Sequence, residues 1–213
     1  MNKKVKILIV SPVYPYPPID GHKNRIYNLF RHFPTGNILD FIAFGDADNL
    51  PAPDALKTRL GPCFRNVELI SHSTLKKIDT NGMLSRLKNI YYPMEQSIGE
   101  PYLSDVMMER IQEMIAVNRY DLAFLCGLYI SLHFDRESSG IPYVVDVSDS
   151  PSLLLRSYFK KERYPLKKCA GLLDYIWADR YEKIHCSRIK NMIMISEIDA
   201  GVIRKNCPHS RIW

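Results

Sequence analysis

Short apolar runs alternate with amphipathic stretches along the 213 residues of the chain. The apolar runs stay apolar along their whole length instead of alternating with polar residues. This pattern predicts strands that are covered on both faces, as in a parallel sheet. The predicted strands are residues 4–10, 38–44, 67–71, 121–126, 142–148 and 190–196.

The stretches between these strands carry apolar residues at spacings of three and four, which predicts amphipathic helices. Ser104 stands at the position expected of the N-cap of one of them. Residues 72–100 mix helix signals with prolines, and a short helix with a loop is expected there. The predicted longer helices are residues 22–33, 103–118, 166–189 and 197–205.

A strand–helix–strand series of this kind predicts an α/β fold. We expect a doubly wound, mainly parallel Rossmann-like sheet with helices on both faces. A chain of 213 residues is long enough for one large domain or two small ones. The sequence contains no internal repeat and no low-complexity tract.

The net charge of +6 is moderate, and it permits nucleic acid, an anionic membrane or a phosphorylated ligand as partner. Basic residues are spread over many segments and no nucleic-acid motif occurs, so no nucleic-acid partner is expected. One local concentration would attract an anionic membrane and give peripheral membrane contact, with an ordinary solvated helix flank as the alternative. It consists of Lys160, Lys161, Arg163, Lys167 and Lys168.

The five cysteines show no C-x-x-C pair and no metal-ligand spacing, so reduced structural thiols and no metal site are expected. The longest later apolar run, residues 122–130, is far shorter than the roughly 20 residues that span a bilayer. These features predict a soluble cytoplasmic protein. Attachment to the inner face of the plasma membrane is compatible with them.

Ligands of doubly wound sheets bind beyond the carboxyl ends of the strands, which directs attention to the segments that follow each predicted strand. The first strand is followed by "SPVYPYPPIDGHKNR", residues 11–25, whose prolines predict an extended and restricted loop. Gly21 allows close approach of a ligand, and the following helix N-terminus favours an anion. His22, Lys23 and Arg25 add positive charge there. The alternative is a helix-starting turn without a ligand.

Only one glycine occurs in this loop, and no phosphate-binding lysine motif is present, so neither a nicotinamide nor a flavin cofactor is expected.

The second candidate segment is "VVDVSDSP", residues 144–151. Asp146 or Asp149 there could take a proton from a hydroxyl or bind a sugar hydroxyl. Alternatively, Asp149 caps the next helix and Asp146 bonds loop amides. Ser196 and Glu197 follow the last strand, as binding residues or as an ordinary helix N-terminus.

The segment "KILIVSPVYPYPPIDGHKNRIYNLFRHF" resembles the opening of retaining GT-B glycosyltransferases of family 4, most closely the bacterial sugar transferases of exopolysaccharide gene clusters. Three further segments resemble this family in the same order, so the resemblance covers nearly the whole chain. They are "YYPMEQSIGEPYLSDVM", "YVVDVSDSPSLLLRSYF" and "DYIWADRYEKIHCSRIKNMIMISEIDAGVIRK". The family has two Rossmann-like domains that face a cleft: the N-terminal one mainly holds the acceptor, and the C-terminal one binds the nucleotide-sugar.

The resemblance implies roles for individual residues. Gly21 would lie near the donor phosphates, and His22 and Arg25 would line the cleft. Asp149 matches the acidic position of a strand-end motif and would orient acceptor or donor hydroxyls as the catalytic candidate. The common His-Asp pair of that motif reads Ser148-Asp149 here, which argues against a histidine-based role. The substrate- or phosphate-binding candidates are Gly21, His22, Arg25, Asp146, Ser148, Ser196 and Glu197.

By this resemblance, residues 1–213 are a single acceptor-side domain. The nucleotide-sugar domain is absent from this sequence, and another domain would supply it in cis or in trans. We therefore expect the acceptor-binding half of a retaining glycosyltransferase. The complete enzyme would move a sugar from a nucleotide-sugar to a saccharide or lipid-linked acceptor in surface polysaccharide synthesis, without a cofactor, and this half alone would be inactive or nearly so. The alternative is a non-catalytic binding or regulatory module that retains the fold.

Overall fold

The computed structural model describes residues 4–45, 53–75, 84, 86, 87, 90, 103–134 and 139–213. The chain divides into two compact units. The first comprises residues 1–75 and 103–145, and the second residues 76–102 and 146–213. The helix and loop expected over residues 72–100 fall mostly outside the described residues, and the single domain expected over residues 1–213 stays a prediction.

The first unit is built on a parallel sheet. Its strands are β1 (Lys6–Ser11), β2 (Ile38–Gly45), β3 (Phe64–Ser71) and β4 (Leu122–Cys126). Their order is β3-β2-β1-β4, and each pair of neighbours is parallel. The next strand, β5 (Tyr143–Val147), begins beside β4, where the Ala123 amide donates to the Pro142 carbonyl over 2.9 Å. The α/β fold with a parallel sheet is thereby confirmed.

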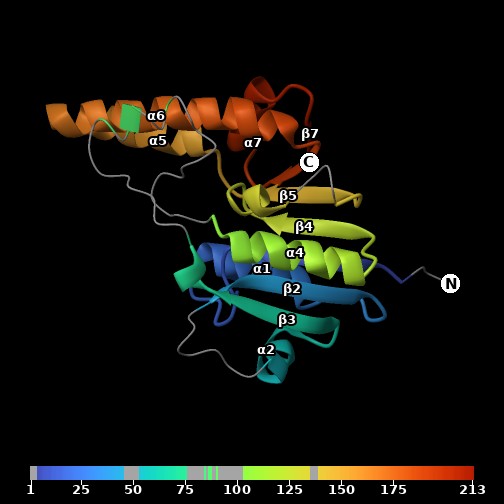
Figure 1. Cartoon of the computed structure of the whole chain (residues 1–213). Coiled ribbons are helices and arrows are strands. Elements are labelled where there is room, and N and C mark those ends of the chain that lie inside the picture. Colours follow the sequence, from blue (N-terminus) through green and yellow to red (C-terminus); the bar gives the residue numbers. More distant parts are fainter. Residues whose placement is uncertain are drawn as a thin grey trace. The chain divides into compact units, whose positions relative to one another are not determined.

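Helices cover both faces of this sheet, as Figure 1 shows for α1 (Gly21–Phe30) and α4 (Asp105–Val117), which lie on opposite sides of it. The Phe30 ring of α1 meets the Phe124 ring of β4 edge-on, at 5.0 Å between centroids. The buried side chains of α4 are Met107, Ile111 and Met114. The remaining helices of this unit are α2 (Pro53–Leu60) and the short turns η2 (His72–Thr74) and η3 (Ile130–His133).

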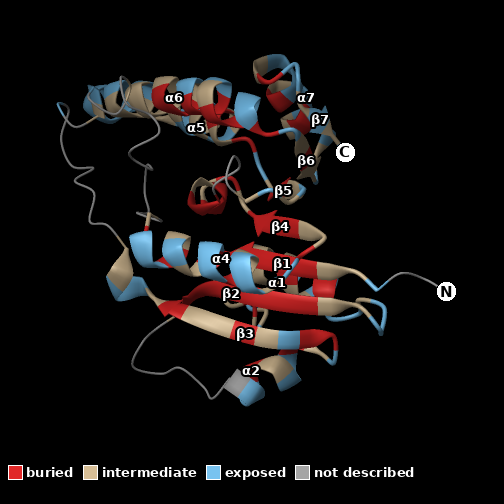
Figure 2. Cartoon of the chain, turned by 45° about the vertical axis from the view of Figure 1, so that its right-hand side comes forward, coloured by how far each residue is buried: buried red, intermediate tan, exposed pale blue. Residues whose placement is uncertain are grey.

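The second unit contains a pair of long helices packed along each other, α5 (Pro151–Lys161) and α6 (Pro165–His185) (Figure 1). The other elements of this unit whose bounds are described are η4 (Cys186–Arg188), β6 (Asn191–Met194), α7 (Glu197–Asn206) and β7 (Arg211–Ile212), with β6 and β7 parallel. Trp177 and Tyr181 of α6 are buried and stack at 5.2 Å. Figure 2 shows the buried residues of α6 toward its carboxyl-terminal half.

All six predicted strands and the four predicted longer helices are present, with bounds that differ by a few residues. Strands β1 and β2 are buried along nearly their whole length, as their unbroken apolar runs predict. Ser104 is the N-cap of α4, and its side chain accepts from the Met107 amide. Helices α2 and α5 and strand β7 were not predicted. None of the helices in the described part of the chain is both long and apolar enough to span a membrane.

Candidate functional site

The strand order of the first unit reverses beside β1. The chain runs from β1 outward to β2 and β3, and it returns to place β4 on the other side of β1. In a doubly wound sheet such a reversal marks the ligand-binding position, at the carboxyl ends of the two central strands. The proline-rich loop leaves β1 at this edge, and the loop that contains Gly127 leaves β4 there.

The proline-rich loop is fastened to the neighbouring helices by its tyrosines. Ser11 at the end of β1 donates its hydroxyl to the Val13 carbonyl over 2.7 Å. The Tyr14 hydroxyl donates to the Leu56 carbonyl of α2 over 2.9 Å, and its ring meets Phe41 edge-on. Burial raises the pKa of the Tyr14 phenol to about 12. The loop is therefore held by side-chain packing as well as by its prolines.

Two neighbouring tyrosines, each covered by an arginine, add further contacts on the outside of the loop. The Arg59 guanidinium lies 5.1 Å from the centre of the Tyr16 ring, and that ring lies 5.9 Å from Tyr27 of α1. The Arg31 guanidinium covers the Tyr27 ring at 5.2 Å. Such cation–π contacts contribute roughly 0.5–1 kcal/mol each at exposed sites. The loop is thus stacked between α1 and α2, which the sequence analysis did not anticipate.

The first turn of α1 is capped by a residue that the sequence analysis did not single out. The Asp20 carboxylate accepts the Lys23 amide over 2.8 Å. Gly21 is exposed, has no positive φ, and a Cβ placed on it would meet nothing within 4 Å. Open space therefore lies beside Gly21, as a ligand-facing position requires. The Asp20 charge, however, already satisfies one of the amides that would bind an anion.

His22 and Arg25 follow in the same helix and are half-buried. The structure therefore brings Gly21, His22 and Arg25 together at the start of α1, next to the carboxyl end of β1. Their proposed contacts with phosphates or with a cleft remain predictions.

The end of β4 is occupied by structural contacts. Gly127 adopts a φ of 116°, which favours glycine, and the chain then enters η3. His133 of η3 is buried, and its Nε2 accepts the Ser104 amide over 3.0 Å. Its Nδ1 lies 3.2 Å from the Ile130 carbonyl, so the imidazole is neutral with its proton on Nδ1. His133 thus supports the start of α4. Among the described residues there is no group of three His, Cys, Asp or Glu that could hold a metal.

In the second unit, the predicted residues lie on the segments that follow β5 and β6. Asp146 is buried within the last residues of β5, Ser148 is half-buried, and Asp149 is exposed. The N-cap of α5 is Ser150, whose side chain accepts the Leu153 amide, so the alternative in which Asp149 caps this helix is wrong. The Asp149 carboxylate makes no hydrogen bond or ion pair with any part of the chain that the structure describes.

The loop that carries Asp149 is tied to the start of α7. The Ser150 amide donates to the Asp199 carboxylate over 2.8 Å. Ser196 is the N-cap of α7, and its hydroxyl accepts the Asp199 amide over 3.4 Å. Ser196 thus begins a helix, and a binding role for Ser196 stays a prediction. The structure therefore brings the segment of Ser148 and Asp149 to the segment of Ser196 and Glu197.

Glu197 is engaged with its own helix. Its carboxylate forms an ion pair with Arg204, and this contact lowers the pKa of Glu197. Both side chains are largely exposed, so the pair contributes little to stability. A role of Glu197 in substrate binding stays a prediction.

A buried carboxylate behind this loop was not found from the sequence. Glu182 of α6 has no exposed surface and accepts four hydrogen bonds. Its Oε1 accepts from the Ser150 hydroxyl at 2.7 Å and from the Ser152 amide at 2.8 Å. Its Oε2 accepts from the Ser152 hydroxyl at 2.7 Å and from the Asn206 amide at 2.8 Å. Glu182 therefore fixes the first turn of α5 and, through it, the loop that ends at Ser150.

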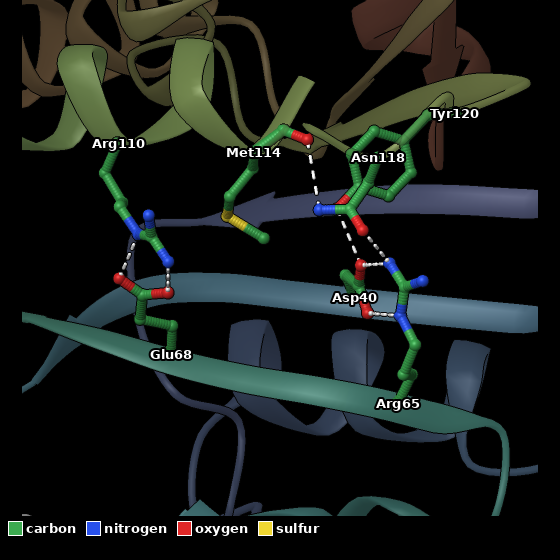
Figure 3. Close-up of polar contacts among 7 residues, drawn as sticks. All are labelled: Asp40, Arg65, Glu68, Arg110, Met114, Asn118 and Tyr120. Atoms are coloured by element: carbon green, nitrogen blue, oxygen red, sulfur yellow. Dashed lines mark hydrogen bonds and ion pairs between the residues drawn. The ribbon is translucent and has the colours of Figure 1, made fainter. Parts of the chain in front are cut away.

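A second polar cluster lies at the opposite edge of the first unit's sheet (Figure 3). Asp40, near the start of β2, is buried and accepts the Arg65 Nε at 3.0 Å and the Tyr120 hydroxyl at 2.6 Å. Burial, followed by the hydrogen bond to Asp40, raises the pKa of Tyr120. Arg110 of α4 forms a bidentate pair with Glu68 of β3 at 2.6 and 2.9 Å. The Asp40 group lies at the amino ends of the strands, away from the ligand-binding edge, and has a structural role.

No family model matches the sequence, and no curated protein matches it. Solved structures of glycosyltransferases resemble its backbone. UGT71G1 of Medicago truncatula complexed with UDP-glucose has 13% identity and a TM-score of 0.49, covering 100% of this chain and 51% of that one. UGT89C1 of Arabidopsis thaliana complexed with UDP has 11% identity and a TM-score of 0.48, with coverages of 99% and 51%.

A UDP-glucosyltransferase from Polygonum tinctorium has 12% identity and a TM-score of 0.46, covering 100% of this chain and 52% of that one. The chain thus spans about half the length of the solved structures that it matches. At identities this low and TM-scores below 0.5, these similarities assign no function to the chain.

Proposed function

We propose that residues 1–213 are the acceptor-side half of a GT-B glycosyltransferase, with the nucleotide-sugar site formed by a further domain in cis or in trans. The complete enzyme moves a sugar from a nucleotide-sugar to a saccharide or lipid-linked acceptor, with retention of configuration, in surface polysaccharide synthesis. This half alone transfers little or no sugar. The proposal is supported by the ordered resemblance to family 4 transferases and by the parallel sheet whose strand order reverses beside β1.

The single observation that carries the proposal is the exposed carboxylate of Asp149, which has no partner among the described residues. This carboxylate lies at the carboxyl end of β5. The loop beneath it is anchored through Ser150 to Glu182 and Asp199. A carboxylate on a loop that is anchored in this way accepts hydrogen bonds from sugar hydroxyls with little loss of conformational entropy on binding. It can also accept the proton of an attacking hydroxyl.

The acceptor role is tested by nuclear magnetic resonance with the ¹⁵N-labelled chain. The probes are methyl glycosides of glucose, galactose and N-acetylglucosamine and short oligosaccharides of each. Binding is expected to shift the amide signals of residues 147–150. Asp149→Asn should weaken the affinity about tenfold, because it removes a charge-assisted hydrogen bond.

Glu109→Gln is the matched control, because Glu109 is an exposed carboxylate on α4 in the first unit. It should leave the affinity unchanged. If no saccharide shifts the signals of residues 147–150, or if Asp149→Asn binds as well as the unaltered chain, Asp149 is not an acceptor-binding residue.

A further inference from the structure

The end of the α5–α6 pair carries most of the net charge of the chain. We define the hairpin tip as residues 156–169, which include the end of α5, the turn, and the first residues of α6. It contains six basic residues and one acidic residue, a net charge of +5 out of +6 for the whole chain. The basic residues are Arg156, Lys160, Lys161, Arg163, Lys167 and Lys168.

The hairpin tip also exposes large apolar and aromatic side chains. Residues 163–169 are all exposed, a run of seven. Within the tip, Tyr158 is 61% exposed, Tyr164 68% and Leu166 81%. Figure 2 shows the contrast with the carboxyl-terminal half of α6, which holds the buried residues of this helix. Aromatic and leucine side chains among lysines, left uncovered by the chain that the structure describes, suit an environment that is apolar on one side and charged on the other.

The positive charge of the hairpin tip is not neutralised locally. Its single acid, Glu162, accepts the Arg163 amide at 2.8 Å and the Tyr164 amide at 2.9 Å, so this carboxylate is bound to the backbone of the turn. None of the six basic side chains forms an ion pair with a described acidic residue. The Lys167 ammonium lies 5.2 Å from the Tyr164 ring centre, and that of Lys168 lies 5.8 Å from the Phe159 ring centre. Ammonium groups and aromatic rings therefore lie side by side at the hairpin tip.

We propose that the hairpin tip docks on the surface of an anionic lipid bilayer. The ammonium and guanidinium groups would meet lipid phosphates, and Tyr158, Tyr164 and Leu166 would enter the headgroup region. A second copy of this chain is a poor occupant, because it would bring a second charge of +5 against the first. The inference does not depend on the proposed glycosyltransferase function, because it rests only on the charge and exposure of this segment.

The test uses the 213-residue chain and two kinds of vesicle, phosphatidylcholine alone and phosphatidylcholine with a quarter phosphatidylglycerol. Binding is measured by co-sedimentation of the unlabelled chain. In a second readout, an environment-sensitive fluorophore is attached to Cys169, which is exposed while the other four cysteines are buried. We expect binding and a blue shift with the anionic vesicles only, and weaker binding at 0.5 M than at 0.1 M salt.

Variants separate the two contributions to docking. Lys160→Glu with Lys161→Glu should weaken binding more than about 25-fold, since each basic residue near the surface contributes about fivefold. Tyr164→Ser with Leu166→Ser should weaken it about tenfold and remove the blue shift, while salt-sensitive adsorption remains. The matched control is Lys190→Glu with Lys205→Glu, which makes the same change in net charge at exposed positions outside the hairpin tip and should reduce binding far less.

Absence of binding to anionic vesicles overturns the proposal. So does equal binding to both vesicle types, or equal loss of binding in the matched control, because charge at the hairpin tip would then not determine it. Sedimentation velocity identifies the competing occupant: a dimer that Tyr164→Ser with Leu166→Ser dissolves would show that a second copy covers the tip and would equally refute membrane docking.

Discussion

Replacement of Glu182 tests the structural basis of the candidate site. This carboxylate has no exposed surface and accepts hydrogen bonds from Ser150, Ser152 and Asn206 at 2.7–2.8 Å. Glu182→Ala removes the acceptor from all four donors and leaves a small cavity. Glu182→Gln retains the shape and one acceptor oxygen, so the two substitutions are expected to differ widely in their cost.

The loss in free energy of unfolding depends on whether each hydrogen-bond donor finds another acceptor after the substitution. In Glu182→Ala, the two serine hydroxyls, 3.2 Å apart, can turn toward each other, but the Ser152 amide and the Asn206 side chain lose their partner. A stranded buried donor costs about 1–3 kcal/mol, and the cavity adds to it, so we expect a loss of about 3–5 kcal/mol in the free energy of unfolding. In Glu182→Gln, the Ser152 hydroxyl and the Asn206 amide can rotate to present acceptors, and about 1 kcal/mol is expected.

The assay is urea unfolding followed by tryptophan fluorescence. The chain has two tryptophans, and Trp213→Phe leaves only Trp177, which is buried in the same helix as Glu182. The midpoint should fall strongly in Glu182→Ala and slightly in Glu182→Gln, at an unchanged slope. Glu109→Gln serves as the surface control, with an expected change within about 0.5 kcal/mol. A loss below about 1 kcal/mol in Glu182→Ala would refute the role of Glu182 as the anchor of the α5 start.

Two further substitutions test the proline-rich loop. Gly21→Val should change the free energy of unfolding by less than about 0.5 kcal/mol in urea unfolding, because a Cβ at this position meets nothing within 4 Å; a large loss would make Gly21 a structural turn. The Tyr14 pKa is raised to about 12, so this phenol stabilises the folded state below the unfolded pKa of about 10, and that contribution is lost as the pH rises from about 10 to 12. In an absorbance titration at 295 nm, Tyr14→Phe should remove a late-titrating phenol, and an unchanged late phase would contradict the burial of Tyr14.

The strands were predictable because the residues of each strand by themselves show that it is buried. Runs such as residues 38–44 are apolar throughout, and only a sheet covered on both faces accommodates them. The Ser104 cap was predictable for the same reason, because a cap acts within three residues of itself. The reversal of strand order beside β1 follows from the fold class, and Gly21 lies in the segment that follows β1, while its role in binding stays a prediction.

The start of α5, for which Asp149 was one alternative cap, shows a local limit of sequence analysis. Asp149 and Ser150 are both good N-cap residues, and the choice between them depends on where the helix begins. Pro151 is the signal that could have decided it, because proline favours the first helical position and makes Ser150 the cap. With that signal, both α5 and the fact that the Asp149 carboxylate does not cap it could have been predicted.

Glu182 shows a limit of another kind. In the sequence it is an ordinary polar residue of an amphipathic helix. Its burial arises because α5 and α7 place Ser150, Ser152 and Asn206 around it, from positions 24 to 32 residues away. The stacking of Tyr16 against Arg59 has the same origin, since it joins the loop to a helix that was not predicted. Contacts between distant segments carry no local pattern.

Two titrations of the ¹⁵N-labelled chain decide whether it binds the acceptor and not the donor. One uses the methyl glycosides and oligosaccharides named above, and the other uses UDP-glucose. We expect saturable saccharide shifts at residues 147–150 and no binding of UDP-glucose below millimolar concentration. Micromolar binding of UDP-glucose by this chain alone, without a saccharide response at residues 147–150, would contradict this expectation.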